Sequence, residues 1–199
     1  MVVYGKTLGG GVACGVVCGK AHLMNRFDPV HPLRVSYVIG TFAAAPATLG
    51  PMSAFLDWVT TDDARSEYEA ATRSTSDWII DTNRKLAAAG YPLRVDHLTT
   101  VWTVLFLRPG RYHWMLQYYM RAEGLALSWV GTGRCLFSLD FSADDYAAVQ
   151  TKLLAAAAAM KEGGWWWDGA TASGIKMRLA REFAVAMLVP LMAWRVKRA

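Results

Sequence analysis

A lysine near the first residue is the group whose type and setting best suit chemistry. Lys6 stands in the sequence Gly-Lys-Thr at residues 5–7, and a glycine triplet follows at residues 9–11. A nucleotide-binding P-loop needs a further glycine upstream of Gly5 and a helix directly after Thr7, and the sequence predicts neither. A primary amine in a largely buried site can lose its proton and attack an aldehyde. The alternative is a solvated lysine in a surface loop.

The other polar candidates form weaker patterns. The four histidines show no metal-ligand spacing, so we predict no metal site. Three cysteines without a CxxC pair give no disulfide framework, and a reducing cytoplasm is the simplest compartment. We expect Cys14 and Cys18 to be small core residues. The acidic pairs at 62–63 and 144–145 stand at predicted helix starts, where the helix dipole explains them better than acid/base catalysis does.

Composition and charge exclude some classes of protein. The chain has 199 residues, 54% of them hydrophobic and 19% charged, which indicates a folded protein. Residues 1–174 hold equal numbers of basic and acidic side chains, so the whole net charge of +5 lies in residues 175–199. A neutral body argues against nucleic acid as a partner. The longest uncharged run, residues 35–56, contains two glycines and two prolines, and we do not predict that it spans a membrane.

Apolar periodicity and turn residues predict a succession of helices and strands. We expect strands at 2–4, 12–17, 93–100, 101–107, 125–130 and 135–139, a loop at 5–11, and helices at 20–26, 45–60, 61–89, 112–123 and 142–160. Residues 91–160 then form a compact α+β unit, and the long helix ties it to the first sixty residues.

The residues after 160 form a separate segment of unusual composition. Three consecutive tryptophans at 165–167 are expected to plug against the body rather than to bind a ligand. The basic end, from residue 175, predicts an amphipathic helix that docks on its own body or on a neighbouring domain. Peripheral contact with a membrane, through its Lys and Arg side chains and Trp194, is the other possibility.

The N-terminal motifs resemble one family. Residues 4–11 (Tyr-Gly-Lys-Thr-Leu-Gly-Gly-Gly), the segment 15–19 and His22 with its two successors resemble the cofactor-lysine segment of class III pyridoxal-phosphate aminotransferases, and most of all the glutamate-1-semialdehyde aminomutases. Residues 40–42 (Gly-Thr-Phe), followed by Pro46, resemble the next landmark of the family. The resemblance covers residues 1 to about 160.

This resemblance implies an α/β fold, the C-terminal part of a fold-type I pyridoxal-phosphate-dependent transferase. Lys6 would carry pyridoxal 5'-phosphate as a Schiff base and move the substrate proton, and Thr41 would bind the cofactor phosphate, reaching the site of the neighbouring subunit. The substrate would be an amino acid or amino ketone, the full-length enzyme a cytoplasmic homodimer, and the reaction an amino-group transfer or aminomutase isomerisation.

The resemblance also divides the chain into domains. Residues 1–60 would be the C-terminal part of the cofactor-binding large domain, and residues 61–90 would be the helix that connects it to the next domain. Residues 91–162 would be the small α+β subdomain, and residues 163–199 a Trp-rich linker with a basic amphipathic tail. Arg134 lies where related aminotransferases often keep a contact with the substrate carboxylate.

The sequence departs from the family in two ways. Ala13 replaces a usual proline, and three alanines at 43–45 replace a Ser-Gly-Asn turn, which changes the expected phosphate loop. The family's ring-gripping residues precede the lysine, and this sequence starts at the lysine strand. We therefore expect a C-terminal portion that binds cofactor poorly by itself. A catalytically inactive remnant, or a structural subunit that needs a partner chain, is the alternative.

Overall fold

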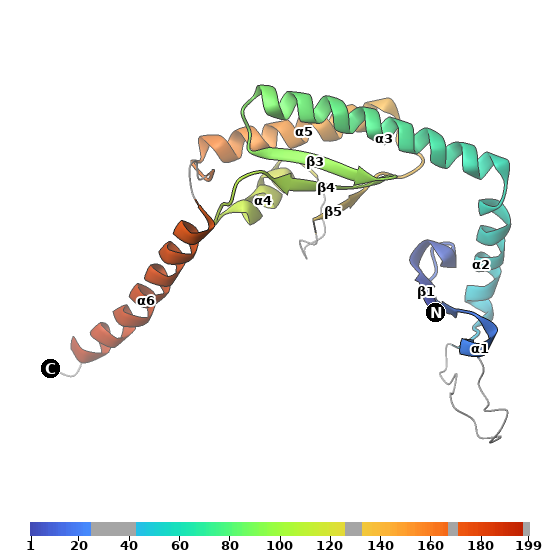
Figure 1. Ribbon diagram of the computed structural model, residues 1–199, viewed down its shortest axis with the longest axis horizontal. Coiled ribbons are helices and arrows are strands. Elements are labelled where there is room, and N and C mark those ends of the chain that lie inside the picture. Colours follow the sequence, from blue (N-terminus) through green and yellow to red (C-terminus); the bar gives the residue numbers. More distant parts are fainter. Residues whose placement is uncertain (25–42, 126–132, 167–170, 197–199) are drawn as a thin grey trace, which may run out of the picture. The chain divides into compact units, whose positions relative to one another are not determined.

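The computed structural model describes residues 1–24, 43–125, 133–166 and 171–196 (Figure 1). The chain divides into two compact units, Met1–Glu67 and Tyr68–Ala199. None of the helices that the structure describes is long and apolar enough to cross a membrane.

A two-stranded ribbon begins the first unit. Strand β1 (Val2–Gly5) pairs antiparallel with β2 (Gly15–Cys18), with Val2 opposite Cys18. The expected strand at 2–4 is confirmed, and the one expected at 12–17 begins three residues later. The expected loop at 5–11 is wrong in part, because Lys6–Gly9 forms one turn of 3-10 helix, η1. Such a short 3-10 turn needs little helix propensity. It ends at Gly10, which takes the left-handed conformation (φ 58°) that glycine adopts without strain.

The part of the first unit that the structure describes also contains α1 (Ala21–Met24) and α2 (Pro46–Val59), which confirms the helix expected at 45–60. Pro46 lies in the first turn of α2, where its missing amide hydrogen costs no hydrogen bond. The apolar side chains of α2 do not form one buried face: Met52, Phe55 and Val59 are half-buried, but Leu49 and Leu56 are exposed. Within this unit the described residues supply no element that covers those two leucines.

The long helix α3 (Asp62–Ala88) begins and ends at the expected signals. At its start, the Thr61 hydroxyl accepts a hydrogen bond from the Ala64 amide at 3.1 Å. At its end Gly90 is left-handed (φ 67°), and the Tyr91 amide donates to the Leu86 carbonyl at 3.0 Å. This is the Schellman geometry that a glycine after a helix predicts.

An antiparallel sheet organises the second unit, with the order β3 (Leu93–Leu98), β4 (Val101–Phe106), β5 (Arg134–Leu136). These strands confirm three of the predicted ones with small changes of bounds. The fourth, at 125–130, lies outside the described residues except for Leu125. A tight turn joins β3 to β4, with Thr99 left-handed at φ 54°. The sequence gives no glycine or asparagine signal for this turn.

Helices cover one face of this sheet, as Figure 1 shows for α3 and α5 (Ala143–Glu162) lying side by side. The predicted helix at 112–123 is instead a 3-10 turn, η2 (His113–Met115), followed by α4 (Leu116–Ala122). The side chains buried between sheet and helices form one apolar core: Trp78, Ile79, Leu86, Leu93, Val95, Trp102, Leu116, Met120, Phe137, Tyr146, Leu153, Ala156, Ala157 and Met160.

The C-terminal segment meets its expectation in part. Trp165 and Trp166 pack against the core, which confirms the predicted plug for these two rings, while Trp167 lies outside the described residues. Helix α6 (Ala172–Val196) follows. Its Ile175 and Leu179 are half-buried, but its later apolar side chains up to Leu188 are exposed. Docking of the tail on its own body therefore holds only for the first turns.

Candidate functional site

Lys6 occupies a strained position directly after a strand. Gly5 ends β1 in an extended conformation (φ −162°), and Lys6 then takes a left-handed φ of 57°. Left-handed backbone is uncommon for residues other than glycine and costs about 1–3 kcal/mol. The left-handed backbone sets the direction in which the lysine side chain leaves the end of the ribbon.

Glycines close the loop behind the lysine. The Gly10 amide donates to the Thr7 carbonyl at 2.9 Å, and the Val12 amide donates to the Gly9 carbonyl at 3.0 Å. Gly9 is buried, and a Cβ atom there would lie 3.0 Å from the Cys14 sulfur. At Gly10, a Cβ atom would lie 3.0 Å from Cβ and the carbonyl oxygen of Pro51. The glycine triplet thus lets α2 and the start of β2 lie against the lysine turn.

Cys14 packs against the glycines of this loop. Its thiol is half-buried against Gly9 and lies 3.9 Å from the Lys6 carbonyl, to which it is positioned to donate. The sequence predicts both Cys14 and Cys18 in the core; Cys14 is half-buried and lies outside the apolar core, and Cys18 is exposed because it lies at the open end of the ribbon. The sequence alone does not tell which of the two cysteines is half-buried, because that depends on the register in which β1 and β2 pair.

The Lys6 side chain is exposed, as are Val2, Val3, Tyr4 and Val17 of the ribbon. Within the first unit, the described residues cover neither face of the ribbon around them. An accessible primary amine has the chemistry that the aldehyde of pyridoxal phosphate requires, so Lys6 fits this cofactor at its covalent attachment point. The burial that would favour the neutral amine is not provided by the residues described.

The other predicted site residues cannot be joined to Lys6. Thr41 lies outside the described residues. Arg134 is exposed on β5 in the second unit, where it pairs in register with Thr103 of β4. Thr103 in turn lies opposite Asp96, and Asp96 accepts a hydrogen bond from the Arg94 guanidinium at 2.5 Å. Arg134 therefore belongs to a polar row across the sheet, opposite the face that holds the core.

Metal binding finds no support in these residues. In the parts of the chain that the structure describes, no three His, Cys, Asp or Glu side chains are grouped so that they could hold an ion. Two partly buried groups have shifted pKa values: burial lowers the pKa of His113 and raises the pKa of the Cys135 thiol. His113 stacks on Phe106, with ring centroids 4.0 Å apart, so it acts as a packing ring.

Curated relatives of the chain are aminomutases. The glutamate-1-semialdehyde 2,1-aminomutase of Nitratidesulfovibrio vulgaris (strain DP4) is 26% identical over 161 residues, which cover 75% of this chain and 36% of that enzyme. The enzyme of the same name from Anaeromyxobacter sp. (strain Fw109-5) is 29% identical over 106 residues, 53% of this chain and 23% of the enzyme. No model of a protein family matches the chain.

Solved structures of transaminases share the fold. An omega-transaminase from Sphaerobacter thermophilus superposes with a TM-score of 0.66 at 20% identity, over 78% of this chain and 37% of its own. A transaminase with PLP bound gives a TM-score of 0.68 at 19% identity, over 81% and 38%. Likeness at this identity establishes the fold, and the aminomutase relatives agree with it. The chain is similar in sequence and in fold to a C-terminal portion of class III aminotransferases.

The similarity to these enzymes covers only part of their length. The chain spans 36% of the length of the Nitratidesulfovibrio relative that it matches. Its mixed helices and sheets form part of a fold-type I fold, which confirms the fold expected from the sequence. The family assignment rested on the glycine-flanked Lys6 and its spacing to residues 40–42, and the comparisons confirm that assignment.

Proposed function

We propose that the chain is the part of a pyridoxal-phosphate-dependent aminotransferase or aminomutase that supplies the cofactor lysine. The observation that carries the proposal is Lys6 itself, held left-handed between β1 and a glycine turn in a chain of this family. The full-length enzyme would transfer an amino group to or from an amino acid or amino ketone. Its working form would be a cytoplasmic homodimer.

Lys6 would do two tasks in this enzyme. Its Nζ would hold the cofactor covalently through the aldehyde carbon, and as a free amine the same group would take and return the proton at the substrate carbon. The chemistry that pyridoxal phosphate supplies when bound is electron withdrawal from that carbon. The left-handed backbone at Lys6 supports both tasks, because it directs the side chain out of the end of β1 beside the hydrogen-bonded glycine turn.

Thr41 would bind the cofactor phosphate with its hydroxyl and backbone amide. A hydroxyl next to a glycine is suited to a phosphate, because the backbone can approach the anion closely. In the resembled family this threonine serves the site of the neighbouring subunit, which is why the proposal includes a dimer. The alanines at 43–45 leave this loop without the family's turn residues.

A second candidate is a non-catalytic remnant or structural subunit that needs a partner chain. The exposure of Lys6 and of the ribbon's valines favours it, because a working cofactor lysine needs a covered, dry site. The two candidates differ in one respect that can be measured, which is selective reaction of Lys6 with pyridoxal phosphate.

Absorbance separates the candidates. The purified chain is mixed with one equivalent of pyridoxal phosphate, alone and after co-expression with the remaining portion of the enzyme. We expect a band near ~420 nm from the amine–aldehyde condensation, which borohydride removes and the variant Lys6→Ala lacks. Lys20→Ala, at an exposed lysine two residues beyond β2, is the matched control and should keep the band. Equal bands in wild type and Lys6→Ala, or no band with the chain alone and none after co-expression, would favour the non-catalytic remnant or structural subunit.

A further inference from the structure

Helix α6 presents large apolar side chains that the described residues leave uncovered. Met177 and Met187 are each 71% exposed and Phe183 is 68% exposed, while Val185 and Leu188 are more than half exposed. Among the apolar side chains of α6 that the structure describes, up to Leu188, Ile175 and Leu179 are partly buried, and they lie one turn apart on one face. These apolar side chains lie on the same part of the helix surface as Lys176 and Arg181, and an exposed apolar surface of this kind commonly marks a binding site.

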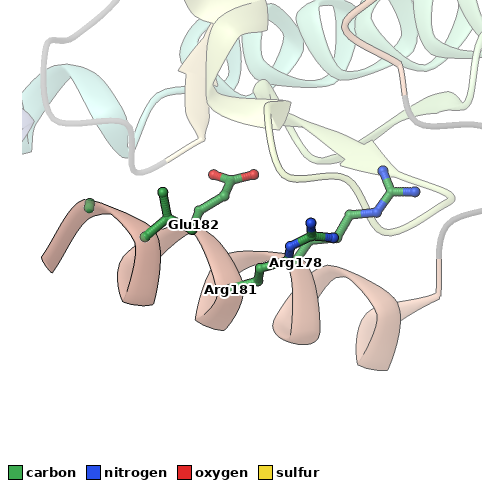
Figure 2. Close-up of a pocket in the computed structure, with 5 residues that line it drawn as sticks. Arg178, Arg181 and Glu182 are labelled. Atoms are coloured by element: carbon green, nitrogen blue, oxygen red, sulfur yellow. The ribbon is translucent and has the colours of Figure 1, made fainter. Parts of the chain in front are cut away.

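An ion pair connects the first half of α6 to the body. Glu182 pairs with Arg111, which lies between β4 and η2. Figure 2 shows Glu182 projecting from α6 close to Arg178 and Arg181, and these residues line a shallow surface pocket together with Val185. Glu182 is the single acidic residue from 175 to 199, and Arg111 balances its charge. The remaining charges of the segment are all basic.

Charge and hydropathy together indicate the chemistry of the partner. The whole +5 charge of the chain lies in residues 175–199, where basic residues stand on both sides of the uncharged segment 183–194. A second copy of the chain would bring the same positive charge and be repelled. An anionic bilayer can bind both the apolar and the basic side chains of this segment. The apolar side chains enter the boundary between headgroups and acyl chains, while Lys and Arg contact the phosphates.

The length of the uncharged segment determines how the helix would lie. At the rise of an α-helix, residues 183–194 extend about 18 Å, well short of the ~30 Å hydrocarbon core of a bilayer. We propose that α6 binds the surface of an anionic membrane, lying in the headgroup region with Phe183, Met187 and Leu188 inserted. This interaction goes beyond the amino-transfer function and does not depend on it.

Co-sedimentation with lipid vesicles tests the proposal on the full chain. Vesicles of phosphatidylcholine alone are compared with vesicles containing phosphatidylglycerol, at low and high salt. We expect sedimentation with the anionic vesicles only, weakening as salt screens the charges. Lys176→Gln with Arg181→Gln should weaken binding at least about fivefold. Phe183→Ser with Met187→Ser should abolish it.

Matched variants outside α6 control for charge and hydropathy. Arg65→Gln with Arg73→Gln removes two exposed basic side chains from α3, and Ile80→Ser removes an exposed apolar one (68% exposed). Both should bind as wild type does, and circular dichroism should show all variants folded because the altered side chains are exposed.

Three outcomes would overturn the proposal. They are no sedimentation with anionic vesicles, equal sedimentation with neutral ones, and α6 variants that bind as the controls do. Light scattering adds a fourth: a concentration-dependent dimer that Phe183→Ser with Met187→Ser abolishes, without lipid binding, would identify a second copy as the occupant of this surface.

Discussion

At the scale of single residues, the lysine turn is determined by where glycine is required. Gly10 is left-handed at φ 58°, and a Cβ atom there would meet Pro51 of α2 at 3.0 Å. Any other residue would therefore suffer both backbone strain and a contact that α2 must relieve by moving. The position of Lys6 depends on this turn, since Gly10 closes it onto Thr7.

Gly10→Ala should destabilise the chain by about 1–3 kcal/mol, because the new methyl group meets Pro51 and the left-handed backbone disfavours alanine. Gly50→Ala is the control: Gly50 lies inside α2, a Cβ atom there meets nothing within 4 Å, and the helix should gain about 0.5–1 kcal/mol. The midpoint of urea unfolding measures both. Equal effects of the two substitutions would contradict the close contact between the lysine turn and α2.

At single residues, the sequence alone predicted the identity of the candidate lysine but not its burial. Lys6 and its glycines could be recognised because lysine between glycines is a local pattern. The half-buried place of Cys14 and the exposure of Lys6 depend on which elements cover the ribbon, and no local pattern reports that. Thr41 stays a prediction.

At the scale of elements, helix ends followed their local signals. The hydroxyl of Ser142 accepts from the Asp145 amide, and the Ser142 amide donates to the Asp145 carboxylate at 2.8 Å, a capping box at the start of α5. The side-chain hydrogen bond from Ser142, and then its backbone hydrogen bond, lower the pKa of Asp145 below its ordinary value of 3.8. The folded state thus favours the ionised carboxylate.

Ser142→Ala should cost about 0.5–2 kcal/mol at neutral pH, because the cap loses its hydroxyl. A lowered pKa stabilises the fold above pH 3.8 and this contribution is lost as the pH falls through the folded pKa, so the wild-type advantage should shrink below pH 3.8. Urea unfolding at neutral and acidic pH measures it. Asp144→Asn, in the same first turn, should cost less, about 0.3–1 kcal/mol from the helix dipole alone. A pH-independent cost of Ser142→Ala would contradict the cap.

Elements without strong signals could not be placed from sequence. The turn at Thr99 closes the β3–β4 hairpin without glycine or asparagine, because the paired strands and the core beneath them hold the left-handed threonine. The helix expected at 112–123 divides into η2 and α4 for a related reason: His113 is held against Phe106 of β4. In both places tertiary packing outweighs local propensity.

At the scale of the whole molecule, the two units differ in burial. In the part of Met1–Glu67 that the structure describes, Gly9 and Ala64 are the fully buried residues, whereas Tyr68–Ala199 contains the apolar core. Residues with few buried contacts open at low free energy. We therefore expect the lysine ribbon to open at a lower free energy than the sheet of the second unit.

Amide hydrogen exchange on the full chain should reveal this difference. Amides of β1 and β2 should exchange much faster than those in the centre of β3 and β4, because the ribbon's valines are exposed while Val95 and Trp102 are buried. Slow exchange in the ribbon would mean that further residues cover it, which would favour an assembled cofactor site over an open one.

The central claim is that Lys6 is the cofactor lysine, and peptide mapping after reduction tests it most directly. The chain, co-expressed with the remaining portion of the enzyme, is mixed with one equivalent of pyridoxal phosphate, reduced with borohydride and digested, and the modified peptides are quantified by mass spectrometry. We predict that the label lies predominantly on Lys6, and that Lys6→Arg removes it without moving it to Lys20. A label spread evenly over the exposed lysines, unchanged in total by Lys6→Arg, would contradict the claim.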